Sequence, residues 1–215
     1  MVIKKISFKH GWYYYYRIHE PKVNEHTQSF PELKSYLYDV FDNCPHDYFQ
    51  VEPRSSHLKF NLNNLKLQSV KNHEVSNLSK LGLKANEKRY SSNHSKVQMF
   101  MLEEDANTLA IEVPLWLKHD ELSNYEKIFS STNPLTGHID ALRIENGNIW
   151  IWDYKPKAHE EKFASTQTFF YAYMLSKRTG IPLTKFRCGY FDSDNTYVFN
   201  PNICKLPQVQ ELLTK

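Results

Sequence analysis

The stretch of sequence that decides the fold covers residues 137–155 and reads GHIDALRIENGNIWIWDYK. Two runs of apolar, β-branched and aromatic residues flank the pair Asn146-Gly147. This pattern predicts a β-hairpin with a two-residue turn. A turn of that length fixes the pairing of the two strands, so we expect Ile144 opposite Ile149.

The same register, continued away from the turn, brings Asp140 opposite Asp153. Opposed residues have Cβ atoms about 4.5–5.5 Å apart, and like charges at that separation are destabilising. A divalent cation with oxygen ligands offsets the repulsion, as does a shared proton or exposure at the sheet edge. Lys155 projects from the same face as Asp153. Near a metal it positions a water or stabilises a phosphate; otherwise it pairs with an aspartate.

An amphipathic helix is predicted after the hairpin, from Glu160 to Arg178. Gln167 is a polar residue in its apolar stripe, and Tyr171 follows four residues later on the same side. A strand-to-helix connection returns this helix across the sheet. We therefore expect both side chains near the aspartates or a bound strand, the alternative being a core tyrosine with a glutamine at the edge of the stripe.

Shorter patterns predict the remaining elements. Strands are expected over residues 3–18, 58–62 and 108–117, and helices over residues 31–41 and 94–102. The first of these segments contains Trp12 and four consecutive tyrosines, Tyr13 to Tyr16. Such aromatic side chains either stack on single-stranded bases or line both faces of a sheet.

Composition indicates a globular protein, since 40% of the 215 residues are hydrophobic and 24% are charged. Residues 1–100 carry 15 basic against 9 acidic side chains, whereas residues 101–215 carry 12 against 15. A basic half can neutralise phosphates and an acidic half can hold hard cations. With no signal peptide and no apolar run of membrane-spanning length, we expect a soluble cytoplasmic protein.

The three cysteines, Cys44, Cys188 and Cys204, lie far apart and without CxxC spacing. This spacing predicts reduced, buried thiols rather than a disulfide scaffold, a zinc site or an iron–sulfur site.

The combination of GHID at residues 137–140, DYK at residues 153–155 and Gln167-x-x-x-Tyr171 resembles the PD-(D/E)XK nuclease superfamily. The RecB-type branch, which includes CRISPR adaptation nucleases, is the most similar. The resemblance implies that Asp140, Asp153 and the main-chain carbonyl of Tyr154 ligate Mg²⁺ or Mn²⁺. It also implies that Lys155 assists the water nucleophile and that Gln167 and Tyr171 border the site and contact DNA.

Two upstream positions extend the resemblance. Glu112 matches the acidic residue of the family's first core strand, although its alternation with apolar neighbours also fits an exposed strand residue. His94, 18 residues earlier, matches the helical histidine ligand of the RecB-type branch, with His73 as an alternative. An isolated histidine at a helix start is otherwise a structural residue. The cysteines cannot supply the four thiolates of cluster-bearing relatives.

Together these features predict a restriction-endonuclease-like α/β fold with a mixed central sheet flanked by helices. Residues 1–90 are expected to form a substrate-binding extension and residues 91–215 the nuclease core, with Lys80, Lys84 and Lys88 binding DNA. The predicted activity is Mg²⁺-dependent hydrolysis of DNA. A catalytically weak or inactive nucleic-acid-binding protein with the same fold is the alternative. DNA is the expected partner, and no interaction with a membrane is expected.

Overall fold

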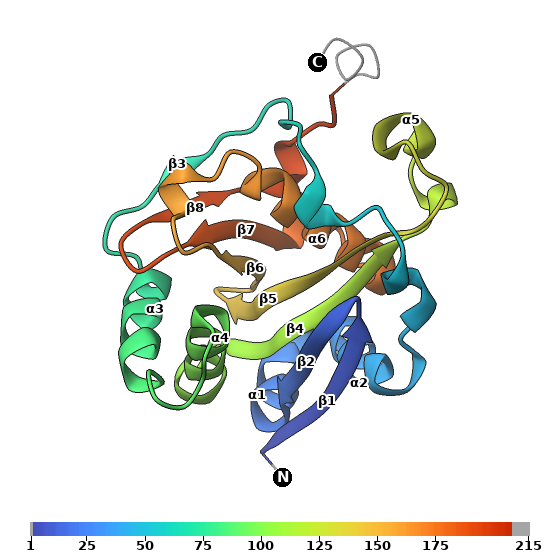
Figure 1. The fold of residues 1–215 in the computed structure, drawn as a ribbon. Coiled ribbons are helices and arrows are strands. Elements are labelled where there is room, and N and C mark those ends of the chain that lie inside the picture. The colour runs from blue at the N-terminus through green and yellow to red at the C-terminus, as the bar shows by residue number, and fades with distance from the viewer. Residues whose placement is uncertain (1, 208–215) are drawn as a thin grey trace.

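The computed structural model describes residues 2–207 and contains an eight-stranded sheet with helices on both faces (Figure 1). The strand order is β1-β2-β4-β5-β6-β7-β8-β3. Strands β6 and β7 run parallel, whereas the other neighbouring strands of the described residues run antiparallel. The mixed α/β architecture expected from the sequence is therefore confirmed.

The elements have the following bounds. The strands are β1 (Ile3–His10), β2 (Trp12–His19), β3 (Gln68–Ser69), β4 (Thr108–Leu117), β5 (Leu135–Glu145), β6 (Asn148–Tyr154), β7 (Phe186–Phe191) and β8 (Thr196–Phe199). The α-helices are α1 (Glu20–His26), α2 (Pro31–Asn43), α3 (Glu74–Ala85), α4 (Asn93–Glu104), α5 (Tyr125–Phe129) and α6 (Ala164–Thr179).

The hairpin β5–β6 has the predicted register. Ile144 pairs with Ile149 across a turn in which Asn146 and Gly147 both have positive φ, at 50° and 70°. Such angles are the requirement of a two-residue hairpin turn, and the Asn-Gly pair meets it with little strain. The turn therefore sets the positions of all residues further along both strands.

The sheet separates two apolar layers. On one face, α2 and α6 contribute Leu37 and Phe170 to a cluster that includes Leu142 and Ile151 of the hairpin. On the other face, α3 and α4 pack through a second cluster that contains Trp152. The helix α6 connects the parallel strands β6 and β7, which require such a crossover because a tight turn cannot join parallel neighbours (Figure 1).

The first strands of the chain extend the sheet along its β4 edge. Strand β2 pairs with β4 through Arg17–Ile111 and Ile18–Ala110, and β1 pairs with β2 along its whole length. The N-terminal segment thus lies directly beside the strand that carries Glu112. Its strands and the hairpin β5–β6 belong to one sheet (Figure 1).

Two predictions of secondary structure need correction. Residues 58–62 are described but form no strand, although Leu58, Phe60 and Leu62 are buried in the alternating pattern that favoured one. The Phe60 carbonyl accepts a 2.6 Å hydrogen bond from Thr166 Oγ1 of α6 in place of a strand partner. The helix expected from residue 160 begins at Ala164, after a 3₁₀ turn over Ala158–Glu160.

The helices within residues 2–207 include none that combines the length and apolar character needed to cross a lipid bilayer.

Candidate functional site

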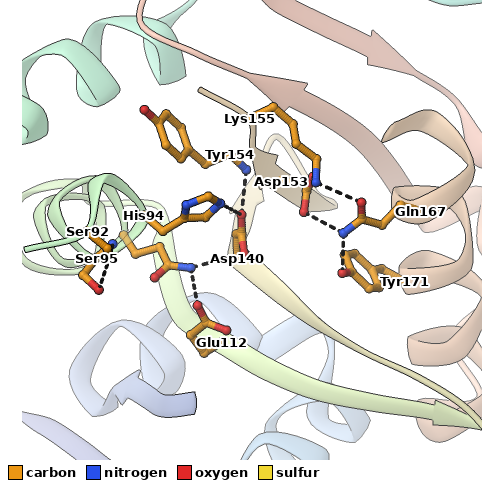
Figure 2. A network of polar contacts seen from close by, with 11 residues as sticks. Ser92, His94, Ser95, Glu112, Asp140, Asp153, Tyr154, Lys155, Gln167 and Tyr171 are labelled. Carbon is orange, nitrogen blue, oxygen red and sulfur yellow. Dashed lines mark hydrogen bonds and ion pairs between the residues drawn. The ribbon is translucent and has the colours of Figure 1, made fainter. Parts of the chain in front are cut away.

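Three carboxylates lie side by side on adjacent strands of the sheet. Glu112 on β4 sits between the pairs Ile111–Ala141 and Val113–Ile139, which puts it opposite Asp140 of β5. Asp153 of β6 follows one step beyond the pair Ala141–Trp152 and so faces Asp140 from the other side. Figure 2 shows the three side chains together with their partners. The central strand thus carries an aspartate with an acidic neighbour on each flank.

The regular hydrogen bonding between strands β5 and β6 is interrupted where these carboxylates lie. The main-chain N–H of Tyr154 donates a 2.8 Å hydrogen bond to Asp140 Oδ2, so a side chain here takes the place of a strand-to-strand bond (Figure 2). On the neighbouring strand Glu112 has a φ of 52°. A left-handed residue that is neither glycine nor asparagine is strained, and such strain concentrates at functional sites. The backbone therefore departs from regular pairing at two of the acidic positions.

The helix α4 contributes two side chains from the side of Glu112. Gln98 Nε2 donates hydrogen bonds to Glu112 Oε1 at 2.7 Å and to Asp140 Oδ1 at 3.2 Å. His94 lies one turn earlier, with Nε2 3.9 Å from Asp140 Oδ2. Its ring and that of Tyr154 form a T-shaped pair with centroids 5.0 Å apart (Figure 2). The predicted histidine therefore points toward the central carboxylate.

The helix α6 holds the opposite side of the site. Lys155 Nζ lies 2.8 Å from Asp153 Oδ2 and donates a 2.9 Å hydrogen bond to Gln167 Oε1. The amide of Gln167 donates in turn to Asp153 Oδ1 at 3.2 Å and to the Tyr171 hydroxyl at 2.7 Å (Figure 2). Gln167 thus connects the lysine, the aspartate and the tyrosine, and its place in an apolar stripe is explained by these bonds.

Gly137 makes the approach of α6 to β5 possible. A Cβ at this position would overlap Tyr171 Cε1 and Ser55 Oγ. The absence of a side chain lets the tyrosine ring lie against the strand three residues before Asp140.

The electrostatics of the site reflect carboxylates removed from water. Burial, and then the neighbouring Asp140, raises the pKa of Glu112 to about 8. Burial also raises the pKa of Asp153 to about 6, although the Lys155 ammonium opposes this shift. Burial lowers the pKa of Lys155, but its ion pair with Asp153 outweighs that effect and leaves it above the usual value. Glu112, Asp140 and Asp153 are three acidic groups beside the single ammonium of Lys155. A cation bound among them would stabilise their ionised forms.

These carboxylates face a cleft of about 590 Å³. Beside them, the cleft is lined by aromatic residues of β2 and by two basic side chains, namely Trp12, Tyr13, Tyr14, Tyr15, Arg17 and Arg54. Trp12 is 75% exposed, and Tyr13 and Tyr15 are 56% and 51% exposed. Tyr16, by contrast, is fully buried and donates a hydrogen bond to the Leu37 carbonyl. The tyrosines thus lie on both faces of the strand. Tyr16 packs in the core, whereas Tyr13, Tyr14 and Tyr15 form a wall of the cleft together with Trp12.

Most of the site residues singled out in the sequence meet in this cleft. It is lined by His94, Glu112, Asp140, Asp153, Lys155, Gln167 and Tyr171. His73 lies elsewhere, where its Nδ1 caps α3 by accepting from the Val75 N–H at 3.2 Å. Lys80, Lys84 and Lys88 are exposed on α3 and just after it, and the residues lining the cleft do not include them.

Sequence reasoning missed Gln98 and Arg17. Gln98 follows His94 by four residues and so shares its helix face, the same spacing that marked Gln167 and Tyr171. Arg17 lies two residues beyond Tyr15 on β2 and is brought to the cleft by the pairing of β2 with β4. That pairing joins residues far apart in the sequence, and no local pattern indicates it.

Comparison with known proteins identifies the family. The model of the PD-(D/E)XK nuclease superfamily matches residues 58–212, well over half of the chain. Searches of the curated proteins and of the solved structures found no match. The matched region contains the three carboxylates, Lys155 and the whole of α6. The chain belongs to the PD-(D/E)XK nuclease superfamily.

Proposed function

We propose that the protein is a Mg²⁺- or Mn²⁺-dependent deoxyribonuclease whose centre is formed by Glu112, Asp140, Asp153 and Lys155. The observation that carries the proposal is the alignment of three carboxylates on β4, β5 and β6 with a lysine paired to the outermost one. A nucleic-acid-binding protein has no need for three acidic groups in a cleft, because they repel phosphates.

The donor set fits a hard divalent cation. Carboxylate oxygens are the ligands that Mg²⁺ and Mn²⁺ prefer, and the cation offsets the mutual repulsion of the three acids. We assign Asp140, Asp153 and Glu112 as ligands, with the main-chain carbonyl of Tyr154 beside them. Such a cation, when bound, lowers the pKa of a water and polarises a phosphate oxygen.

We assign His94 as a further ligand because its Nε2 already lies near Asp140 Oδ2. A helical histidine upstream of the first acidic strand also supports membership of the RecB-type branch. Imidazole suits Mn²⁺ better than Mg²⁺, so this residue should influence metal preference.

The chain's own groups have separate tasks in hydrolysis. The Lys155 ammonium orients the attacking water and stabilises negative charge that develops on the phosphate. Gln167 holds that ammonium through its Oε1 and holds Asp153 through its Nε2, so it fixes their relative positions. Tyr171 anchors the amide of Gln167 in turn.

The cleft wall supports a substrate with unpaired bases. Exposed aromatic rings stack on bases regardless of sequence, and Trp12 and Tyr15 offer such rings beside the carboxylates. Arg17 lies in the same wall and is available to a phosphate. We therefore propose that a single-stranded segment of DNA lies along β2 with its backbone directed toward Asp140.

The N-terminal extension of residues 1–90 contributes this wall. The exposed Lys80, Lys84 and Lys88 would continue the phosphate path outside the cleft. Affinity falls with salt concentration, and the steepness of log affinity against log salt distinguishes the two basic sets. Each phosphate contact that is lost makes this dependence less steep by about 0.7 on a single strand. The dependence on salt should be less steep in Arg17→Gln than in the wild type. A less steep dependence in the triple lysine-to-glutamine variant would support the longer phosphate path, and an unchanged dependence in that variant would exclude it.

Incubation with labelled linear single-stranded, linear duplex and circular DNA tests the proposed activity. Cleavage should require Mg²⁺ or Mn²⁺ and stop with a chelator. Products from circular DNA would identify an endonuclease, and products from linear DNA alone an exonuclease. DNA binding without cleavage under every metal condition would support the inactive nucleic-acid-binding protein instead.

A further inference from the structure

A cluster of two histidines and a cysteine lies at the end of strand β1, next to the turn of the N-terminal hairpin. His10 ends β1, Cys44 follows the last residue of α2, and His46 begins a 3₁₀ turn. One potential ligand atom from each lies within 4.8 Å of the others. The three residues are on separate elements, so the cysteine spacing in the sequence gave no sign of them.

The separations approach those of a zinc centre. His10 Nε2 lies 3.0 Å from His46 Nδ1 and 4.0 Å from Cys44 Sγ. Zinc bonds of about 2.0–2.1 Å to nitrogen and about 2.3 Å to sulfur give tetrahedral separations of roughly 3.3 Å and roughly 3.6 Å. The two pairs that include His10 therefore lie within about 0.4 Å of these separations, and Cys44 Sγ lies within 4.8 Å of His46 Nδ1.

The second nitrogen of His10 is held as in metal-bound histidines. His10 Nδ1 lies 2.9 Å from His138 Nε2, and the His10 ring stacks on Phe49 at 3.9 Å. With His10 Nδ1–H as the donor in this contact, Nε2 carries no proton and is free to bind a metal. His138 stacks in turn on Tyr14 at 3.8 Å, and both residues line the carboxylate cleft.

We propose that His10, Cys44 and His46 bind Zn²⁺ through Nε2, Sγ and Nδ1, at a site separate from the carboxylate centre. Two imidazoles and one thiolate suit zinc and not magnesium. His46 is exposed, which leaves the fourth position to water. On binding, the Cys44 thiol releases its proton to solvent and the resulting thiolate offsets part of the ion's charge.

Zinc at this position ties β1, the end of α2 and the turn at His46 together. Through the His10–His138 hydrogen bond it also steadies the wall that carries the exposed aromatic residues. All three ligands precede residue 58, where the match to the nuclease superfamily begins. The site therefore lies in the N-terminal segment outside the matched region, and the proposal of a zinc site does not depend on the proposed nuclease activity.

Metal analysis of the full-length protein tests the proposal. The double variant Asp140→Asn, Asp153→Asn removes two carboxylate ligands of the other proposed centre, and after purification without chelators and dialysis against Zn²⁺ it should retain one equivalent by elemental analysis. Substitution with Co²⁺ should give a thiolate-to-cobalt charge-transfer absorption in the near ultraviolet, which Cys44→Ser removes. The double variant Asp140→Asn, Asp153→Asn should keep the absorption, because the carboxylate centre contains no thiolate. Cys204→Ser is the matched control and should also keep it.

His46→Gln guards against a folding defect of the buried cysteine variant, since the His46 side chain is exposed. Added to the double variant Asp140→Asn, Asp153→Asn, it should abolish the retained equivalent of zinc while the circular dichroism spectrum stays that of the wild type. A chelator should lower the melting temperature of the double variant and leave that of the double variant carrying His46→Gln unchanged. Absence of retained zinc in the double variant, or an unaltered cobalt spectrum in Cys44→Ser, would overturn the proposal.

Discussion

The Lys155 ammonium lies 2.8 Å from Asp153 Oδ2, two residues along the chain from the aspartate it contacts. Lys155 also donates to Gln167, so the ammonium is held between β6 and α6. Its side chain is 17% exposed, which leaves one side open to the cleft. The lysine is thus fixed beside an acidic group and still accessible to a substrate.

Lys155→Ala should lower the turnover number on the order of 10²–10³-fold, the usual cost of losing one electrostatic stabiliser of a transition state. The metal concentration for half-maximal activity should change much less, because the carboxylates remain. Steady-state cleavage rates at saturating DNA, measured over a metal titration, give both quantities. Lys157→Ala is the matched control, since Lys157 is exposed and pairs only with Glu160 among the described residues. Unchanged turnover with weakened metal dependence would contradict the role assigned to Lys155.

The hairpin shows how far local sequence determines this site. The turn at Asn146-Gly147 fixed the register, and Asp140 and Asp153 follow from it by counting. Gln167 and Tyr171 were indicated because a polar residue interrupted an apolar stripe at helical spacing. The positions of these side chains could be predicted because each depends on a repeat set by backbone geometry within one or two elements.

The remaining features depend on contacts between distant segments. Neither the left-handed backbone of Glu112 nor the hydrogen bond from Gln98 is visible without the packing of α4 on β4. At residues 58–62 the local pattern is misleading. Their alternation fits a strand, but the Phe60 carbonyl accepts a hydrogen bond from Thr166 of α6 and the segment forms no strand. Pairing of β2 with β4 joins residues about ninety positions apart, and only the structure reveals that it brings Arg17 and the aromatic wall to the carboxylates.

The metal-free protein should lose stability through Glu112 and Asp153 as pH rises. Burial raises the pKa of Glu112 from 4.5 to about 8 and that of Asp153 from 3.8 to about 6. Between these limits the folded state holds protons that the unfolded state has released, so the free energy of unfolding falls with increasing pH. This contribution is complete below about pH 4 and lost as pH passes through 6 and then 8.

Melting temperatures of the wild type and Glu112→Gln in chelator, measured from about pH 5 to about pH 8, check this prediction. The difference between the two proteins is the relevant quantity, because buried His10 and His138, whose pKa values are lowered by burial, titrate in the opposite sense. The melting temperature of Glu112→Gln should rise relative to that of the wild type as pH increases. Added Mn²⁺ should raise the melting temperature of the wild type most at the alkaline end of this range. A difference that is constant with pH would count against a raised pKa at Glu112.

His94→Ala should raise the metal concentration needed for half-maximal cleavage and shift the preference from Mn²⁺ toward Mg²⁺. The reason is the loss of an imidazole whose Nε2 lies 3.9 Å from Asp140 Oδ2. His73→Ala is the control, because His73 caps α3 and should affect the melting temperature alone. Parallel metal titrations of both variants decide the matter. Equal metal midpoints for wild type and His94→Ala would reduce His94 to a structural residue.

Trp12→Ala should weaken binding of a single-stranded oligonucleotide by on the order of 1–3 kcal/mol, the cost of losing one base–aromatic stack. Trp12 is 75% exposed, so its removal should leave the fold and the melting temperature unchanged. Fluorescence anisotropy in the Asp153→Asn background, where cleavage cannot interfere, measures the affinity. Trp12→Phe retains an aromatic ring and should keep most of the binding. Equal affinities for all three proteins would show that bases do not stack on this wall.

The central claim is that Asp140 and Asp153 bind the divalent cation on which hydrolysis of DNA depends. Its most direct test is the single-turnover rate on end-labelled single-stranded DNA with saturating Mn²⁺, for the wild type and Asp153→Asn. We expect metal-dependent cleavage by the wild type and a loss of at least about 10³-fold in the variant, comparable to removing an essential electrostatic group. The variant should also keep the circular dichroism spectrum and oligonucleotide affinity of the wild type. Cleavage by Asp153→Asn at a rate near that of the wild type would contradict the account.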